Sequence, residues 1–425
     1  MPPLPRLRQD ETARAVLLGS ALAIHVIVWQ TALAIGPTNI PVIQLVAERF
    51  STFAIVFMSM NLVLSTRARV LERWLVGLDK LFVTHRTIGL AVAVLISAHF
   101  LLVPKSVGFV WSKPFGYTVI SLLLIAIFIA SAPRFPWRRL VPLNYQTWKF
   151  SHRFMGLVVA LAVTHSLLGT TYVKSSSLLI VYVYGIAAVG LLAWLYRELA
   201  FPSFGPLRTY EVAAAQPREG GITEVTLAGT SQKLARTAGQ FAVVSFAHGP
   251  TREQHPFTIS SSAEQPIRFS IKASGDYTKA LHADDLPTTA ATIEGPYGAF
   301  RYRRGGRHQL WLAGGIGITP FLAMAADLDV ETDVLLVWSV RTEDEAAYRD
   351  ELSRVSAVKP NLKVVIHATA DRGHLDVSAL RLDAEPSSYS AFICGPVPMR
   401  RALIKQLRSL GVARDETYFE EFRLR

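Results

Sequence analysis

The sequence predicts a bundle of six membrane-spanning helices, followed by a soluble half with a small antiparallel β-barrel and a parallel α/β domain. Three observations support this. Hydrophobic residues make up 51% of the chain and concentrate before residue 200. Two apolar segments of that half are near copies of each other, each bracketed by histidines. After Glu198, short alternating strands and then a strand–helix alternation follow. We place the domains at 1–200, 205–305 and 306–425.

Six apolar runs are long enough to cross a bilayer, since a spanning helix needs about 20 such residues. They lie at about 15–36, 43–65, 80–103, 115–132, 147–170 and 177–199. The first run is too long for a signal peptide, although basic residues precede it. The net charge of +12 does not indicate a nucleic-acid partner, because many basic residues flank the spans. The single Cys394 excludes internal disulfides.

Lysines and arginines are distributed unequally between the two sides of these spans. The N-terminus and the loops near 66–80 and 133–149 are rich in them, whereas the alternate loops carry few. Positive loops stay in the cytoplasm, so both termini are expected there. The third and fifth spans then both run from inside to outside.

The third and fifth spans contain HRTIGLAVAVLISAH, from His85 to His99, and HRFMGLVVALAVTH, from His152 to His165. The two histidines of each segment are about 20 Å apart along a helix. Parallel spans place His85 beside His152 at the cytoplasmic level. His99 then meets His165 at the outer level. A buried imidazole could bond a backbone carbonyl, but the duplicated order favours an iron at each level, hence two haems.

Residues beside these histidines fit the same interpretation. Gly89 and Gly156 stand four residues after each first histidine, on the same helix face, where a missing Cβ would let a flat macrocycle approach. Arg86 and Arg153 follow the first histidines and are expected to meet haem propionates or to anchor the helix at the membrane surface. The sequence lacks a CxxCH motif, which predicts non-covalently bound b-type haem.

The two segments differ in length by one residue. Fourteen residues bring His99 back near the face of His85, because each residue turns a helix by about 100°. Thirteen residues leave His165 well off the face of His152. We therefore expect helix tilt or a local distortion in the fifth span. His25, in the first span, has no counterpart and is expected to be a packed polar residue.

The soluble half begins with a predicted barrel. Its expected strands are 208–214, 222–228, 239–247, 255–261 and 266–273. From about 308 strands alternate with helices, which predicts a parallel sheet. The first strand-to-helix turn reads AGGIGITP (313–320), where glycines would let the backbone approach a pyrophosphate. Thr319 is expected to cap the next helix and Pro320 to lie in its first turn, although a purely structural turn is the alternative.

Two barrel segments and one later arginine carry candidate binding groups. HPFTISSS (255–262) offers the Phe257 ring and the hydroxyls of Thr258 and Ser260, unless it is an ordinary strand start. GDYTKAL (275–281) opens a short helix with Thr278 near its N-terminus, where a phosphate could sit. Arg341 follows the strand VLLVWSV, where it could meet a nucleotide 2′-phosphate or simply face solvent.

With these residues in place, the chain resembles the NADPH oxidase and ferric reductase family over nearly its whole length. HPFTIS is similar to the flavin motif of that family, and GGIGITP and CGP (394–396) to its nicotinamide motifs. The histidine pairs match its bis-haem spacing. The resemblance implies a ferric reductase-like transmembrane bis-haem domain and ferredoxin reductase-like FAD and NAD(P)H domains. It also implies a multi-pass protein of the bacterial inner membrane.

The resemblance also implies roles for single residues. Thr258 would hydrogen-bond the flavin near its reactive nitrogen, and Cys394 would lie near the nicotinamide carbon that gives up hydride. Phe422, or alternatively Phe419, would cover the flavin and yield to the nicotinamide. The other residues expected to bind a cofactor are His255, Pro256, Phe257, Ser260, Gly275, Thr278, Gly295, Gly314, Gly315, Gly317, Thr319, Pro320, Arg341, Gly395 and Pro396.

The implied chemistry moves electrons from NADPH, with NADH possible, through FAD and two b-type haems to an acceptor outside. We expect oxygen to be the acceptor, with superoxide as product. A ferric chelate is the close alternative, and an external protein partner is the third. The outward loops are short, with Phe109, Trp111 and Lys113 as distinctive residues, which favours a small acceptor. No EF-hand loop or long low-complexity tail is visible, so no obligatory protein partner is expected.

Overall fold

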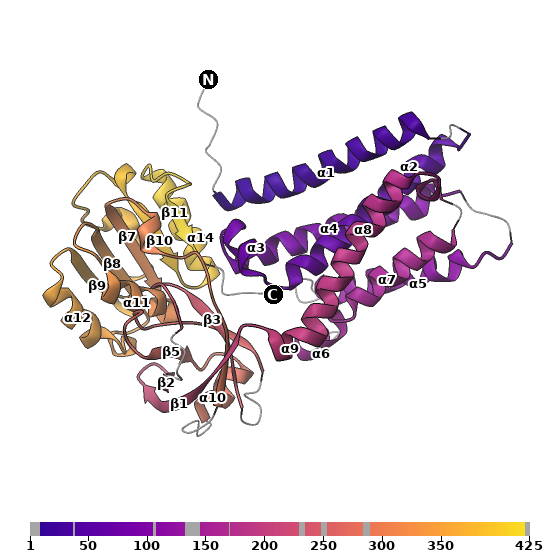
Figure 1. Cartoon of the computed structure of the whole chain (residues 1–425). Coiled ribbons are helices and arrows are strands. Elements are labelled where there is room, and N and C mark those ends of the chain that lie inside the picture. The colour runs from indigo at the N-terminus through magenta and orange to yellow at the C-terminus, as the bar shows by residue number, and fades with distance from the viewer. Residues whose placement is uncertain are drawn as a thin grey trace. The chain divides into compact units, whose positions relative to one another are not determined.

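The structure, a computed structural model, forms two compact units (Figure 1). It describes residues 9–36, 39–104, 108–131, 145–169, 171–228, 234–247, 253–283 and 290–420. The helical unit comprises residues 13–75 and 80–205. The α/β unit comprises residues 206–425 together with 1–12 and 76–79.

Among the described residues, six helical spans are long and apolar enough to cross a membrane, as the sequence predicts. They are α1 (Gln9–Ile35), α2 (Val42–Ser65), α4 (Leu78–Leu102), α5 (Ser112–Ser131), the pair α6 (Tyr145–His152) and α7 (Met155–Leu168), and α8 (Ser177–Leu195). Their outward side chains include strongly exposed apolar residues such as Val94 and Val181, at 69% and 72% exposure. An apolar outer surface of this kind suits contact with lipid.

Short helical segments complete this unit. They are α3 (Arg69–Trp74), the 3₁₀ helix η3 (Tyr172–Ser175), the π-helix η4 (Tyr196–Ala200) and α9 (Phe201–Phe204). The segment η4 continues directly from α8. The fifth span is broken between α6 and α7, so the distortion expected from the histidine spacing is present.

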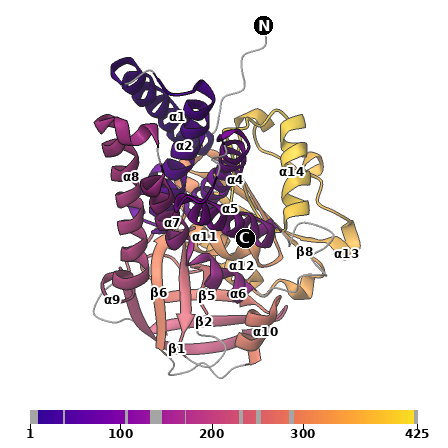
Figure 2. The ribbon, with the colours of Figure 1, turned by 90° about the vertical axis from the view of Figure 1, so that its right-hand side faces the viewer.

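The α/β unit begins with a six-stranded antiparallel sheet in the order β4-β3-β6-β1-β2-β5. Its strands are β1 (Leu207–Arg218), β2 (Ile222–Ala228), β3 (Phe241–Phe246), β4 (His255–Thr258), β5 (Ile267–Lys272) and β6 (Ala290–Tyr297). A bridge between Ile259 and Phe269 brings the two edges together, so the sheet curls into a barrel. Helix α10 (Asp276–Ala283) lies beside β2 (Figure 2).

The central strand β6 is absent from the sequence prediction. It pairs with both β1 and β3. Its sequence AATIEGPY contains Gly295 and Pro296 just before the last residue, Tyr297, and this pair is typical of a turn. Tertiary pairing overrides that local signal, because the neighbouring strands supply partners along most of the segment.

The second part of the α/β unit is a five-stranded parallel sheet in the order β11-β10-β7-β8-β9. Its strands and main helices are β7 (His308–Gly314), α11 (Thr319–Asp327), β8 (Asp333–Val340), α12 (Arg349–Val358), β9 (Leu362–Ala368), β10 (Ser390–Cys394), α14 (Val397–Ser409) and β11 (Thr417–Phe419). Strand order reverses between β7 and β10. Ligands of open parallel sheets bind at the carboxyl ends of strands at such a reversal, which is where residues 314–320 and 394–396 lie.

Candidate functional site

The four bracketing histidines meet in the two expected pairs. The ring centroids of His85 and His152 are 6.0 Å apart, with the rings inclined at 72°. Those of His99 and His165 are 6.3 Å apart, at 79°. Two imidazoles on opposite sides of one metal ion, with bonds of about 2.0–2.1 Å, would have centroids roughly 6.3 Å apart. Both pairs are therefore spaced to hold one ion between their rings.

Backbone carbonyls orient the outer pair. Nδ1 of His99 donates to the carbonyl of Ala47 at 2.9 Å, and Nδ1 of His165 donates to that of Ser112 at 2.7 Å. A carbonyl oxygen only accepts, so the hydrogen sits on Nδ1 and the lone pair on Nε2, as a metal ligand requires. Gly116 makes room for this ring, because a Cβ there would lie 2.7 Å from Cε1 of His165. Gly116 was not predicted as a site residue; a glycine within an apolar span is the sequence feature that could have indicated it.

The sequence also assigned expected roles to His25, Arg86 and Arg153 of the bundle. His25 stacks on Phe53 with centroids 4.6 Å apart, and its Nε2 donates to the carbonyl of Arg49 at 3.1 Å. It is a packed polar residue, as expected. Arg86 is exposed. The guanidinium of Arg153 pairs with the carboxylate of Glu198, with Nε 2.7 Å from Oε2.

The two glycines beside the inner histidines are not equivalent. A Cβ at Gly89 would lie 3.8 Å from Nδ2 of Asn61, an ordinary van der Waals contact, so the approach of a macrocycle to this face stays a prediction. A Cβ at Gly156 would overlap the indole of Trp194. The expectation that Gly156 keeps its face open for a macrocycle is therefore wrong, because α8 carries a large aromatic side chain across it.

The HPFT segment forms β4 and presents a buried hydroxyl. Thr258 is 5% exposed, and its Oγ1 has no hydrogen-bond partner among the described residues. Buried hydroxyls are nearly always bonded, because leaving one without a partner costs free energy. The position therefore fits contact with a polar ligand atom, which is the role expected of Thr258.

Tyr277 joins the two predicted flavin segments. Its ring stacks on His255 with centroids 3.7 Å apart and lies 6.3 Å from the ring of Phe257. Burial, together with the nearby Glu253 carboxylate, raises the pKa of Tyr277 above its usual value. The sequence analysis quoted Tyr277 within GDYTKAL without assigning it a role. Its signal is an aromatic residue in the first turn of a short helix.

The start of α10 is partly capped by its own chain. Oγ1 of Thr278 accepts the N–H groups of Ser274 and Gly275, both at 2.9 Å. These two amides are thus already bonded, and phosphate binding here stays a prediction.

Gly295 lies in β6 with φ of +134°, a region that favours glycine. Pro256 is half-buried within β4.

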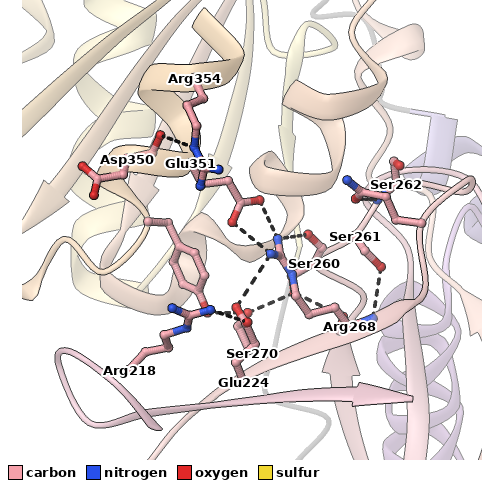
Figure 3. Close-up of polar contacts among 12 residues, drawn as sticks. Arg218, Glu224, Ser260, Ser261, Ser262, Arg268, Ser270, Asp350, Glu351 and Arg354 are labelled. Atoms are coloured by element: carbon pink, nitrogen blue, oxygen red, sulfur yellow. Dashed lines mark hydrogen bonds and ion pairs between the residues drawn. The ribbon is translucent and has the colours of Figure 1, made fainter. Parts of the chain in front are cut away.

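Ser260 points into a polar network that joins the barrel to the parallel sheet (Figure 3). Its buried Oγ lies 2.9 Å from Oγ of Ser270, which accepts a 2.7 Å bond from the hydroxyl of Tyr348. Nη2 of Arg268 donates to the carbonyl of Ser260 at 2.8 Å and to Glu351 at 2.7 Å. This network could not be predicted from the sequence, because Arg268 and Glu351 are 83 residues apart.

The two glycine turns meet backbone to backbone. A Cβ at Gly317 would overlap the carbonyl of Cys394, and one at Gly395 would lie 3.1 Å from Cα of Gly314. Gly315 has φ of +53° and its carbonyl accepts a 2.9 Å bond from Nε1 of Trp338. Only glycine allows this approach, so the two predicted nucleotide motifs lie against each other, and nucleotide binding by these residues stays a prediction.

The helix that follows begins differently from the prediction. A 3₁₀ turn, η7 (Gly315–Ile318), leads into α11, and Pro320 lies in its first turn as expected. Thr319 is the first helical residue, and its hydroxyl donates to the carbonyl of Ile316 at 3.1 Å. The expectation that Thr319 caps the helix is wrong, because the 3₁₀ turn already supplies the entry.

Cys394 ends β10 with its side chain fully buried, beside Gly395 and Pro396. Burial, with the Glu420 carboxylate contributing, raises the pKa of the Cys394 thiol well above its usual value. The thiol is therefore protonated at neutral pH and not activated as a nucleophile. The sequence analysis did not single out Glu420. Phe422 lies outside the described residues.

Known proteins resemble the α/β unit. The oxidoreductase NAD-binding domain family matches residues 311–405, and an FAD-binding domain family matches residues 209–301. The second half of the chain is an FAD- and NAD-binding oxidoreductase module. We call it the reductase module.

Relatives of this module are reductase components and flavohemoproteins. The carnitine monooxygenase reductase subunit of Escherichia coli (strain K12) is 28% identical over 220 residues, covering 50% of this chain and 67% of its own length. The 2-halobenzoate 1,2-dioxygenase electron transfer component of Burkholderia cepacia is 27% identical over 45% of this chain and 60% of its own. The flavohemoprotein of Bordetella pertussis is 24% identical over 39% of this chain and 47% of its own.

One solved structure is similar over most of the chain. The flavohemoglobin from Malassezia yamatoensis, with bound FAD and haem, has a TM-score of 0.50 and 18% identity, covering 93% of this chain and 98% of its own. At this identity the likeness concerns the fold alone. The module is thus of the ferredoxin reductase-like, electron-transfer kind.

Proposed function

We propose that this protein carries electrons across a membrane, from NAD(P)H on the cytoplasmic side to an acceptor outside. The single observation that carries the proposal is the pairing of four histidines, at two levels of an apolar bundle, on a chain that also holds a reductase module. When bound, FAD would take two electrons as hydride and release them singly, and two b-type haems would carry single electrons. This order matches a two-electron donor to one-electron carriers.

The histidine geometry supports haem over a bare metal ion. Among the residues that the structure covers, no group of three or more His, Cys, Asp or Glu side chains could hold a metal. Each level offers two imidazoles, so the remaining ligands would have to come from a macrocycle. The Nδ1 bonds of His99 and His165 fix the tautomer that such ligation needs.

In the reductase module, Thr258 would bond the flavin ring through its hydroxyl, for which no described residue is a hydrogen-bond partner. The turns at Gly314–Gly317 and Cys394–Pro396 lie against each other, because their glycines carry no side chains. For the same reason, the pyrophosphate and the nicotinamide would be able to approach the backbone of these turns. We assign the flavin-covering role to Phe422, with Phe419 as the alternative. NADPH is the preferred donor, because Arg341 lies exposed at the end of β8, where a 2′-phosphate would meet it.

Oxygen is our preferred acceptor, with superoxide as product. His85 with His152, and His99 with His165, would each hold one haem iron from both sides; such haems would supply single electrons without binding oxygen at the iron. The segments 103–111 and 169–176, outward under the positive-inside arrangement, are short, which favours a small acceptor. Reduction of a ferric chelate is the second candidate. The relatives that serve as reductase subunits make a protein acceptor the third.

We place the protein in the bacterial inner membrane with both termini in the cytoplasm. The described basic residues Arg67, Arg69, Arg73 and Lys80 mark one side of the bundle. Cysteine labelling of positions 109 and 69 in intact cells would test this arrangement. Outside labelling at 69 and not at 109 would reverse it.

The haem assignment is tested on purified protein. We expect two b-type haems per chain, and His99→Leu should leave one while NAD(P)H still reduces the flavin. His25→Gln is the matched control, because His25 lies in the same bundle without pairing to another histidine. A wild-type protein with one haem or none would refute the assignment.

The acceptor is tested with NADPH-driven reduction of extracellular cytochrome c. Superoxide dismutase should abolish most of the signal if superoxide is the product. A signal that dismutase leaves unchanged, together with anaerobic reduction of ferric citrate, would replace the oxidase proposal with the ferric-chelate one.

A further inference from the structure

The fifth span is interrupted directly after an inner histidine. Helix α6 ends at His152 and α7 begins at Met155. The N–H of Arg153 is shared between the carbonyls of Lys149 and Phe150, at 3.3 and 3.2 Å. The N–H of Leu157 bonds the carbonyl of Phe154 at 2.9 Å. The bonds to Phe150 and Phe154 span three residues, as in a 3₁₀ helix, whereas the bond to Lys149 spans four, as in an α-helix. This change of bonding pattern marks a local break in the helix.

The break frees one backbone carbonyl. In a continuous helix, the carbonyl of Arg153 would accept the N–H of Leu157, which here bonds Phe154 instead. Nε1 of Trp194 donates to the Arg153 carbonyl at 2.7 Å, from 41 residues away on α8. A carbonyl without a partner is costly in an apolar bundle, so this indole bond stabilises the broken form over others.

Two further contacts from the same end of α8 hold the break. The indole of Trp194 lies over Gly156, where any Cβ would overlap it. Glu198, in the π-helix η4, pairs with the side chain of Arg153, with 2.5 Å between Nη2 and Oε2. Trp194 and Glu198 thus contact the backbone of Arg153, its side chain and the nearby Gly156. We call these two residues the α8 clamp.

The break corrects a register problem. On a straight helix, the thirteen residues from His152 to His165 would leave these side chains roughly 140° apart. The fourteen residues of α4 leave His85 and His99 only about 40° apart. Both histidines of the broken span nevertheless meet their partners, at 6.0 and 6.3 Å. Since α7 already carries His165, the break is what turns His152 toward His85.

We infer that Trp194 is a positioning residue for His152 and, through it, for the inner iron site. The inference rests on the proposed haem binding but concerns only the inner level. The ring of Trp148 also stacks on His152, with centroids 5.2 Å apart, but it precedes the break and cannot set the turn. The α8 clamp contacts Arg153 within the break and Gly156 just after it, where the direction of the chain changes.

Trp194→Phe tests the inference, because phenylalanine keeps an aromatic ring next to Gly156 but has no N–H donor for the Arg153 carbonyl. Low-temperature electron paramagnetic resonance of the oxidised protein resolves low-spin haems by their g-values, which depend on the orientation of the two imidazoles. We expect the inner-haem signal to shift or split, with inner-haem content falling by half or more. The outer-haem signal and the rate of flavin reduction by NADPH should be unchanged.

Trp29→Phe is the matched control. Trp29 is also an indole within the bundle, and its Nε1 donates to Oγ1 of Thr52 at 3.0 Å. It does not contact the break, so both haem signals should match those of the wild type. If Trp194→Phe fails to yield folded protein, Glu198→Gln loosens the other half of the α8 clamp and should produce a smaller shift of the same signal.

The outcomes separate the inference from the proposed function. Wild-type protein without two low-spin haem signals would refute haem binding. Two normal signals in the wild type, unchanged in Trp194→Phe and Glu198→Gln, would overturn the role of the α8 clamp and leave haem binding standing. Equal changes at both haems would also overturn it, since the clamp touches one level only.

Discussion

Gly317 in the reductase module and Gly89 in the helical unit have different surroundings. In the module, a Cβ at Gly317 would overlap the carbonyl of Cys394, so the glycine permits contact between two backbones. In the helical unit, a Cβ at Gly89 would make only a van der Waals contact, 3.8 Å from its nearest neighbour, so no described protein atom requires glycine there. The module site therefore depends on the fit between turns. The pairing of the bundle histidines depends on helix register.

The largest expected effect comes from replacing these two glycines by alanine. Gly317→Ala should slow reduction of the flavin by NADPH on the order of 100-fold, because displacing a bound reactant by about 1 Å costs that much. Gly89→Ala should leave flavin reduction unchanged and alter only the inner-haem spectrum. Stopped-flow absorbance of the flavin measures the first effect. Comparable flavin rates in the two variants would remove the distinction between the two uses of glycine.

Ion pairs extend the comparison. Arg268 and Glu351 form a pair within the module, with side chains 18% and 29% exposed. Arg153 is 52% exposed in its pair with Glu198. Glu351→Gln should lower the stability of the module by about 2 kcal/mol, whereas Glu198→Gln should lower that of the bundle by less than about 1 kcal/mol.

For a domain of this size, the change at Glu351 corresponds to a fall of about 4–8 °C in the midpoint of thermal flavin release. The control Arg354→Gln, on the same helix and exposed, should leave the midpoint within about 1 °C. Equal shifts in Glu351→Gln and Arg354→Gln would show that the Arg268–Glu351 pair does not join the two parts of the module.

Features determined by residues near one another in the sequence could be predicted, whereas features determined by residues on another helix or strand could not. The pairing of the four histidines followed from helix periodicity and direction, and the need for a distortion followed from one missing residue. The place of the break did not follow, because its donor Trp194 comes from another helix. Strand β6 was missed because Gly295 and Pro296 indicate a turn when its partner strands are not considered.

The module shows the same limit. The meeting of the two glycine turns could be expected from strand order, because both turns follow parallel strands at a reversal. The internal bonding of Ser260 could not, since Arg268 and Tyr348 reach it through tertiary packing. Motifs thus indicated candidate ligand-binding residues. Which of these residues instead bond to other parts of the protein depended on contacts between residues distant in sequence.

Thr258 differs from the outer histidines, which have backbone partners on Nδ1, because its hydroxyl lacks a partner within the described residues. Thr258→Val should weaken FAD binding or slow flavin reduction by about 10-fold, the effect of one lost hydrogen bond. Without FAD, the variant should be at least as stable as the wild type. Thr258→Ser, which keeps the hydroxyl, is the control for both measurements. Weaker apo stability in the valine variant would indicate a protein partner for the hydroxyl.

The smallest expected effect concerns Arg341, an exposed cation at the edge of the module rather than a group within it. Arg341→Ala should lower the preference for NADPH over NADH, as a ratio of kcat/KM, by about 5-fold, because an exposed charge pair contributes roughly 1 kcal/mol or less. Added salt should shrink the wild-type preference and leave that of the variant nearly constant, since screening acts only where the cation remains. Arg354 is another exposed arginine, and Arg354→Ala should change neither the NADPH-to-NADH ratio of kcat/KM nor its dependence on salt. An equal preference for the two nucleotides in the wild type, unaltered by Arg341→Ala, would assign the residue to the solvated surface and leave nucleotide choice to other contacts.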